Sequence, residues 1–181
     1  MKKALLVIDV QQEYFTGKLR VTYPTPATSL ANILTVMDRA KQLNMPIFLI
    51  QHTGNSGTTF VKNTAMWSLH PALLTKSYDY LIEKTKPSSF YKTNLESILQ
   101  KEHIHDLVIT GYMTQMCCDT TARDGFHKGY SVEFLADATG TIDVSNAIGI
   151  ISGKELHKAT LIAQSLGFSH VLSTEQWLAE Q

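Results

Sequence analysis

The chain has 181 residues, 44% of them hydrophobic and 18% charged, a composition that is typical of a folded globular protein and excludes a disordered chain. Its 16 lysines and arginines balance 16 aspartates and glutamates, so no basic excess points to a nucleic-acid partner. No apolar run approaches the roughly 18 residues of a membrane span, and residues 4–8 are too short an apolar run for a signal peptide, so we expect a cytoplasmic protein.

Short apolar segments alternate with segments of helical period along the chain. Residues 3–9 are predicted to form a buried strand, and residues 28–43 a helix, because apolar residues recur there at helical spacing. Residues 52–78 have no clear period. Further strands are predicted over residues 46–51, 80–84, 107–110, 131–136 and 170–172, and further helices over residues 114–128 and 174–179.

Two segments have the form of a capping box, in which a Thr or Ser is followed three residues later by Glu. They begin at Thr93 and Ser152, and each is predicted to open a helix. Apolar strands that alternate with amphipathic helices indicate βαβ units and a sheet covered on both faces. We therefore expect one α/β domain over residues 1–181, a three-layer α/β/α fold with a mostly parallel, Rossmann-like central sheet.

Polar side chains follow the predicted strands at the edge where a parallel α/β sheet binds its ligand. They come from separate segments of the chain: Asp9, Gln51, His52, Lys84, Thr110 and Asp137. Cys117 follows the fourth strand, near the start of a predicted helix. The sequence thus places a carboxylate, an ammonium and a thiol at one edge of the sheet.

The two cysteines, Cys117 and Cys118, are adjacent, and a disulfide between neighbours is strained, so we expect free thiols. A free thiol is only a few per cent thiolate at neutral pH. The helix N-terminus and the charge of Lys84 are expected to lower the pKa of the Cys117 thiol, and the Asp9 carboxylate could take and return protons. Each residue alone also has an ordinary explanation, as a turn former, a solvated charge or core filler.

Three stretches of the chain resemble the isochorismatase-like cysteine hydrolases, a family that includes the nicotinamidases and many amidases. They are residues 5–15 (LLVIDVQQEYF), 82–95 (IEKTKPSSFYKTNL) and 108–123 (VITGYMTQMCCDTTAR). The later segments 135–139 and 151–157 also fit the family's pattern. The resemblance therefore extends over nearly the whole chain, in the family's order.

The resemblance implies that Asp9 is the general base and acid, Lys84 its charge partner and Cys117 the nucleophile. It also implies a cis peptide between Tyr112 and Met113, which turns the amides of Met113 and Cys117 toward an oxyanion. The motif selects Cys117 over Cys118. Adjacent helical positions point about 100° apart, so Cys118 is expected to pack inward.

The sequence departs from the metal-containing nicotinamidases, which carry an Asp-x-His segment after the second strand. Here Gln51 and His52 occupy that stretch, without a carboxylate. His52 and His70 could reach the pocket, but two imidazoles without a third ligand make a poor metal site. We therefore expect neither a metal nor another cofactor, although a weak metal site at His52 or His70 is left open.

We expect the pocket walls to come from Phe15, His52, Tyr112 and the stretch 53–78 around Trp67, although Trp67 could equally be a core or subunit-interface aromatic. The predicted reaction is cleavage of a C–N bond in a small amide through a Cys117 thioester. Two alternatives remain: a vinyl-ether hydrolase of the isochorismatase type, which needs no thiol nucleophile, and a non-enzymatic binding protein on the same fold. The expected partners are a small-molecule substrate and further copies of the chain, as a homodimer or homotetramer whose neighbouring subunit could complete the pocket.

Overall fold

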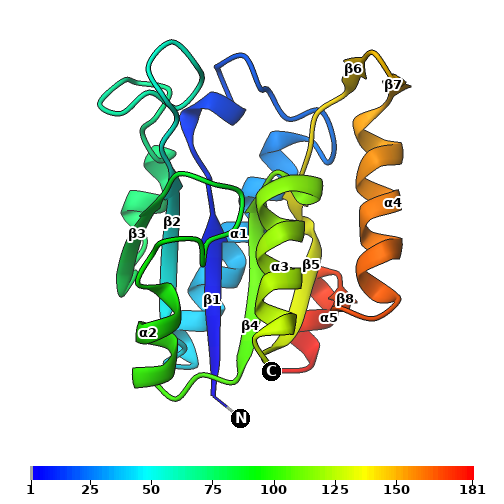
Figure 1. The fold of residues 1–181 in the computed structure, drawn as a ribbon. Coiled ribbons are helices and arrows are strands. Elements are labelled where there is room, and N and C mark those ends of the chain that lie inside the picture. The colour runs from blue at the N-terminus through cyan, green and yellow to red at the C-terminus, as the bar shows by residue number, and fades with distance from the viewer. Residues whose placement is uncertain (1) are drawn as a thin grey trace.

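A six-stranded sheet forms the centre of the computed structural model, which describes residues 2–181 (Figure 1). Its order is β3-β2-β1-β4-β5-β8, and every pair of neighbours in it is parallel. The strands are β1 (Lys3–Ile8), β2 (Ile47–His52), β3 (Tyr80–Lys84), β4 (Asp106–Tyr112), β5 (Ser131–Gly140) and β8 (His170–Leu172). The strand order reverses direction between β1 and β4, and such a switch point is where open α/β sheets bind their ligands.

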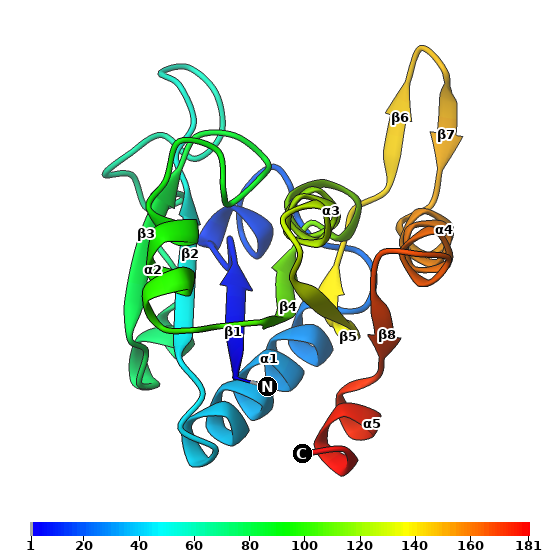
Figure 2. The ribbon, with the colours of Figure 1, turned by 60° about the horizontal axis from the view of Figure 1, so that its bottom comes forward.

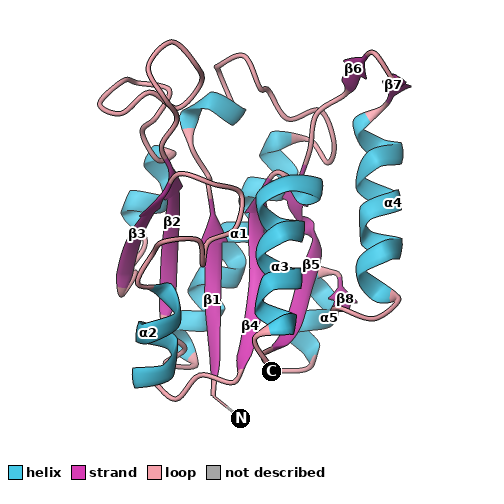
Figure 3. Cartoon of the chain, in the orientation of Figure 1, coloured by secondary structure: helices cyan, strands magenta, loops and turns pink. Residues whose placement is uncertain are grey.

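Helices cover both faces of this sheet and give the predicted three layers (Figure 3). One face carries α1 (Pro26–Gln42) and α5 (Thr174–Ala179), and the other carries the remaining three helices (Figure 2). These three are α2 (Leu95–Lys101), α3 (Asp119–His127) and α4 (Gly153–Ser165). The predicted fold class is therefore confirmed.

Each face of the sheet has its own hydrophobic core, because successive side chains of a strand point to opposite faces. On β1, Leu5 and Val7 belong to the cluster under α1, whereas Leu6 and Ile8 belong to the cluster under α2 and α3. All four are at most 1% exposed. Burial of such side chains contributes about 1.5–3 kcal/mol each, which anchors the central strand whose end positions Asp9.

The structure corrects the predicted helix over residues 114–128. Residues Thr114–Cys118 form a π-helical turn, and α3 begins only at Asp119. A π-helical turn differs from an α-helix by one residue per hydrogen-bonded ring, so the apolar spacing does not reveal it. Such turns are frequent at functional sites, and this one carries Cys117.

Other differences lie at the edges of elements. The strand predicted over residues 131–136 continues to Gly140, and a hairpin of β6 (Val144–Asn146) and β7 (Gly149–Ile151) was not predicted. The capping box at Ser152 is confirmed, whereas the one at Thr93 is wrong. The Thr93 hydroxyl instead donates to Ser89 O at 2.6 Å and accepts from Leu95 N at 3.3 Å, and Asn94, which directly precedes α2, makes no side-chain cap.

Two short 3-10 turns complete the backbone, Gln12–Tyr14 after β1 and Pro71–Thr75 before β3. Within residues 2–181, none of the helices combines the length and apolar character needed to cross a membrane.

Candidate active site

The loops that follow β1, β2, β3 and β4 gather at one end of the sheet (Figure 1). Asp9 comes directly after β1, His52 ends β2 and Lys84 ends β3, where His52 and Lys84 are paired in register. Cys117 lies on the π-helical turn after β4. Parallel strands end at the same edge, so four distant segments of the chain meet there.

Lys84 is the centre of this cluster. Its Nζ lies 2.6 Å from Asp9 Oδ2, 3.2 Å from Cys117 Sγ and 3.3 Å from His52 Nδ1. It also donates to the backbone carbonyl of Lys86 at 3.2 Å. The side chains of both Lys84 and Asp9 are 0% exposed, so the pair is fully withdrawn from water. The structure thus brings together the three residues predicted to be catalytic.

The Asp9 carboxylate is short of hydrogen bonds. Although Lys84 Nζ is close to Oδ2, neither carboxylate oxygen has a hydrogen-bond partner of good geometry among the described residues. Asp9 also has a left-handed backbone conformation, with φ of 52°, so the chain leaves the direction of β1 at this residue. A buried carboxylate is costly unless it is paired or hydrogen-bonded. Its free acceptor capacity suits it to receive a proton.

The surroundings of Cys117 favour its neutral thiol form. Burial raises the pKa of Cys117, the negative charge of Asp9 raises it further, and Lys84 opposes both. The expectation of a lowered thiol pKa is therefore wrong, because desolvation and Asp9 outweigh Lys84. Burial lowers the pKa of Lys84, but Asp9 and Cys117 overcome this effect and hold it above the usual range. Attack by this thiol consequently requires a base.

The two cysteines have different surroundings. Both are free; Cys117 is 7% exposed and Cys118 is 0% exposed. Cys118 Sγ faces the backbone of β4, 4.0 Å from Thr110 O, which agrees with the predicted inward packing. The Tyr112–Met113 peptide is cis, as the resemblance implies. The Met113 amide donates to no acceptor among the described residues.

The predicted pocket residues lie around this cluster in different ways. Tyr112 is 0% exposed, and its hydroxyl lies 2.8 Å from Ser29 Oγ on α1, so it points into the core. Phe15 is half-buried and packs against Tyr112, with ring centroids 5.7 Å apart, and against His70 at 4.4 Å. Their role in substrate binding stays a prediction.

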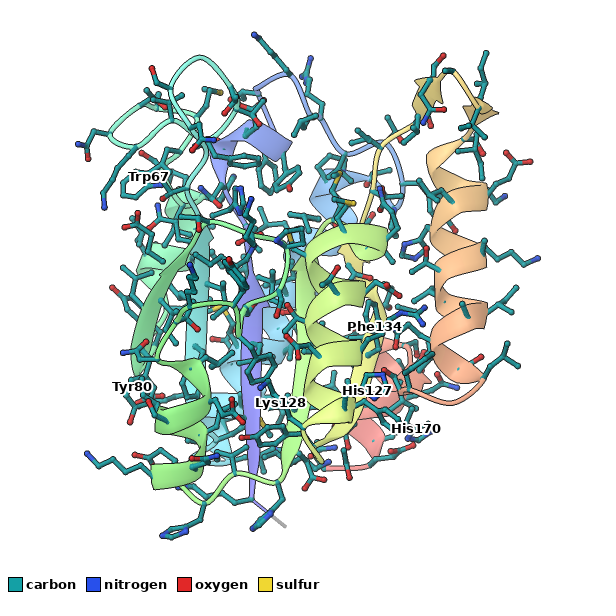
Figure 4. All side chains as sticks on the ribbon, viewed as in Figure 1. Trp67, Tyr80, His127, Lys128, Phe134 and His170 are labelled. Atoms are coloured by element: carbon teal, nitrogen blue, oxygen red, sulfur yellow. The ribbon has the colours of Figure 1, made fainter. Side chains whose placement is uncertain are left out.

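Trp67 lies in the loop region above β2 and β3 (Figure 4). Its indole Nε1 donates to Thr53 Oγ1 at 2.8 Å, and its backbone carbonyl accepts from Gln11 and Gln51. Its ring also lies 5.8 Å from Lys62 Nζ. Trp67 therefore ties the irregular loop to the site, and its contact with substrate stays a prediction.

Two residues of the site were missed. Gln11 is 0% exposed and makes two hydrogen bonds to the backbone of His52, the last residue of β2. Its Nε2 donates to His52 O at 2.9 Å, and its Oε1 accepts from His52 N at 2.8 Å. Tyr14 is 2% exposed, and burial raises its pKa well above the usual value, with Cys117 and Asp9 adding to the rise. Polar or aromatic residues two and five positions after Asp9 are the signal that could have found them.

The residues do not fit a resident metal ion. Asp9, His52 and Cys117 offer ligand atoms within 4.8 Å of one another, but the Lys84 ammonium lies against all three. Its positive charge would repel a cation there. His70 Nδ1 accepts from the Ala72 amide at 3.2 Å and serves as a turn cap.

Comparison with known proteins shows the family and the fold. The family model of the isochorismatase domain matches residues 3–176. The uncharacterized isochorismatase family protein YddQ of Bacillus subtilis strain 168 is 32% identical, with 98% of this chain and 99% of that protein covered. Nicotinamidase 3 of Arabidopsis thaliana is 29% identical over 96% of this chain and 85% of its own. The crystal structure of an isochorismatase-like protein from Burkholderia xenovorans LB400 superposes with a TM-score of 0.96 and 38% identity, covering 98% of this chain and 86% of that one.

Proposed function

The chain belongs to the isochorismatase family of cysteine hydrolases, and we propose that within this family it hydrolyses the C–N bond of a small amide through a thioester on Cys117. The contact that carries the proposal is that of Lys84 Nζ, which lies 3.2 Å from the Cys117 sulfur and 2.6 Å from the Asp9 carboxylate. A nucleophile, a base and a fixed positive charge thus lie within one buried cluster.

Acylation begins with the neutral thiol. Asp9 takes the proton of the Cys117 thiol as the sulfur attacks the amide carbon and a carbon–sulfur bond forms. The amides of Met113 and Cys117 stabilise the negative charge on the carbonyl oxygen. When the tetrahedral intermediate collapses, the C–N bond breaks and Asp9 returns its proton to the leaving nitrogen.

Deacylation uses the same groups with water in place of the thiol. Asp9 takes a proton from the water as its oxygen attacks the thioester carbon. The carbon–sulfur bond then breaks, the acid leaves, and the sulfur regains a proton from Asp9. The positive charge of Lys84 offsets the negative charge that develops on sulfur.

The contacts of Cys117 and the buried Asp9–Lys84 pair favour this chemistry over the alternatives. Vinyl-ether hydrolysis protonates the substrate and needs no thiol nucleophile, whereas Cys117 lies in direct contact with Lys84. A binding protein would have no use for a fully buried Asp9–Lys84 pair, which is costly to desolvate. Similarity to a protein named nicotinamidase also supports amide hydrolysis. Nicotinamide itself is not proposed, because the residues do not fit the metal of the metal-containing nicotinamidases.

The test is to trap the thioester. The protein is incubated with a panel of small primary and N-substituted amides, quenched in acid and measured by intact-mass spectrometry. We expect an acyl adduct that maps to Cys117, that is unchanged in Cys118→Ser and that is absent in Cys117→Ser. Asp9→Asn should remain folded by circular dichroism yet form no adduct. An adduct on Cys118, or turnover by Cys117→Ser, would falsify the proposal.

A further inference from the structure

His157 is a buried imidazole on α4 that the mechanism above does not use. It is 4% exposed, and its Nδ1 lies 2.8 Å from the hydroxyl of Thr114. Thr114 is 0% exposed and is the first residue of the π-helical turn that carries Cys117. A residue 40 positions downstream of the nucleophile is thus bonded directly to the segment that holds it.

The protonation state of this pair follows from its surroundings. Burial lowers the pKa of His157 to about 4, and a hydrogen bond to the Ala136 backbone opposes this effect. The imidazole is therefore neutral near pH 7, and one of Nδ1 and the Thr114 hydroxyl donates to the other. This hydrogen bond links α4 to the π-helical turn.

We propose that His157 is a positioning residue for Cys117, which fixes the π-helical turn through Thr114 and so sets the place of the thiol and of the oxyanion amides. This inference rests on the proposed function for its catalytic consequence. Thr114 follows Met113 directly and lies three residues before Cys117. A shift of Thr114 therefore moves both groups at once, and a misplacement of about 1 Å can cost on the order of 100-fold in rate.

The second restraint on this turn comes from another element. Gln115 Oε1 accepts from Thr141 Oγ1 at 2.6 Å, just beyond the end of β5. Thr114 thus connects the π-helical turn to His157 on α4, and Gln115 connects it to Thr141 next to β5. Loss of the His157 bond should hence loosen the turn without releasing it, so the variants are expected to fold.

Matched substitutions test the hydrogen bond between the ring and Thr114. Asn places a polar atom where Nδ1 was and keeps the link to Thr114, whereas Gln places its polar atoms near the position of the other nitrogen and loses that link. Thr114→Val removes the hydroxyl at almost constant volume. Thr160→Val is the control, because the buried hydroxyl of Thr160 donates to Leu156 O within the same helix and makes no hydrogen bond to the turn.

We expect His157→Gln and Thr114→Val each to lower kcat on the order of 10- to 100-fold, with KM within about twofold, while His157→Asn and Thr160→Val stay within about threefold of wild type. The His157→Gln/Thr114→Val double variant should be no slower than either single variant, since both remove one interaction. Unfolding midpoints in urea show that each variant is folded under the assay conditions. Wild-type kcat in folded His157→Gln and Thr114→Val, or equal losses in Asn and Gln, would overturn the inference.

A second readout needs no substrate. In a Cys118→Ser background, iodoacetamide should modify Cys117 faster and at a lower pH midpoint in His157→Gln than in wild type, because a loosened turn admits water and burial is the largest cause of the raised thiol pKa. The Thr160→Val control should match wild type. Unchanged alkylation in His157→Gln would contradict the positioning role. If no amide acylates Cys117 but alkylation responds as stated, the proposed function fails and the positioning inference stands.

Discussion

At the scale of single residues, the chemistry of the site depends on the charge of Lys84. A lysine that is 1% exposed is rare unless its charge is paired, and here the partner is the fully buried Asp9. A well-packed apolar pair of similar size would often be as stable as such an ion pair. The pair is therefore better explained by catalysis than by stability, because it holds a base and a positive charge beside the thiol.

Removal of Lys84 alone should destabilise the fold. Lys84→Met leaves the Asp9 carboxylate buried without its counterion, and breaking a buried pair in this way costs about 3–5 kcal/mol. Asp9→Asn in the same chain removes the orphaned charge, so the double variant should be more stable than Lys84→Met. Urea unfolding of the three variants measures both effects. A double variant less stable than Lys84→Met would show that the two residues are not energetically coupled.

The same two residues should shift the titration of Cys117 in opposite directions. Asp9 raises the pKa of the thiol and Lys84 lowers it, so Asp9→Asn should lower the pH midpoint of Cys117 alkylation and Lys84→Met should raise it. The measurement is the rate of iodoacetamide modification against pH, in a Cys118→Ser background. Shifts in the same direction for both variants would mean that a structural change, not the two charges, controls the thiol.

At the scale of elements, the site depends on how closely β4 approaches β1 at the switch point of the sheet. Gly111 pairs with Ile8 and has φ of 114°, and a Cβ built on it would lie 2.0 Å from the carbonyl oxygen of Ile8. Only glycine permits this approach. Asp9 follows Ile8 and Tyr112 follows Gly111, so the contact sets the spacing between the base and the turn of the nucleophile.

Gly111→Ala should therefore cost at least about 2 kcal/mol of unfolding free energy, because the new methyl group overlaps backbone that cannot move aside. Gly129→Ala is the matched control. It also has a positive φ, 91°, but a Cβ there would meet nothing within 4 Å, so only the backbone strain of about 1 kcal/mol is expected. Chemical denaturation gives both values, and equal losses would show that the close approach is not required.

The elements that the sequence predicts are those whose burial follows a period. β1 and β2 read as apolar runs because the sheet buries both of their faces. The hairpin of β6 and β7 could not be predicted in this way, since Ile148 and Ile150 are 96% and 85% exposed and no buried alternation marks its strands. The false capping box at Thr93 shows that one local pattern can yield to another, here the hydrogen bond from the Thr93 hydroxyl back to Ser89 O four residues earlier.

Some features of the site could also be predicted from the sequence, and others could not. The convergence of Asp9, Lys84 and Cys117 follows from the rule that parallel strands end at one edge, together with the resemblance to a known family. The sign of the thiol pKa shift could not be predicted, because it is set by the depth of burial around Cys117. The hydrogen bond between His157 and Thr114 joins residues 43 positions apart, and no local sequence pattern predicts it.

At the scale of the whole molecule, buried ionisable groups couple the stability of the fold to pH. The formal net charge is zero at pH 7, so general charge repulsion is small there. Specific groups such as His157 and His52 then contribute to the response to acid. Burial lowers the pKa of both, and Lys84 lowers that of His52 further. The expected homodimer or homotetramer stays a prediction, which sedimentation of the full chain would measure.

The fold should lose stability as the pH falls from about 6.5 to about 4. In this range the unfolded chain binds a proton at His157 that the folded chain does not, so the contribution of His157 to the unfolding free energy decreases with falling pH and levels off below about 4. A lowering from 6.5 to about 4 corresponds to about 3 kcal/mol for His157, and His52 adds a loss of the same sign.

His157→Asn keeps the bond to Thr114 but cannot titrate, so its stability should fall less over the same range. The measurement is urea unfolding at pH 7, 5.5 and 4.5 for both proteins, each checked for reversibility. Parallel losses in wild type and His157→Asn would show that His157 is not buried in its neutral form.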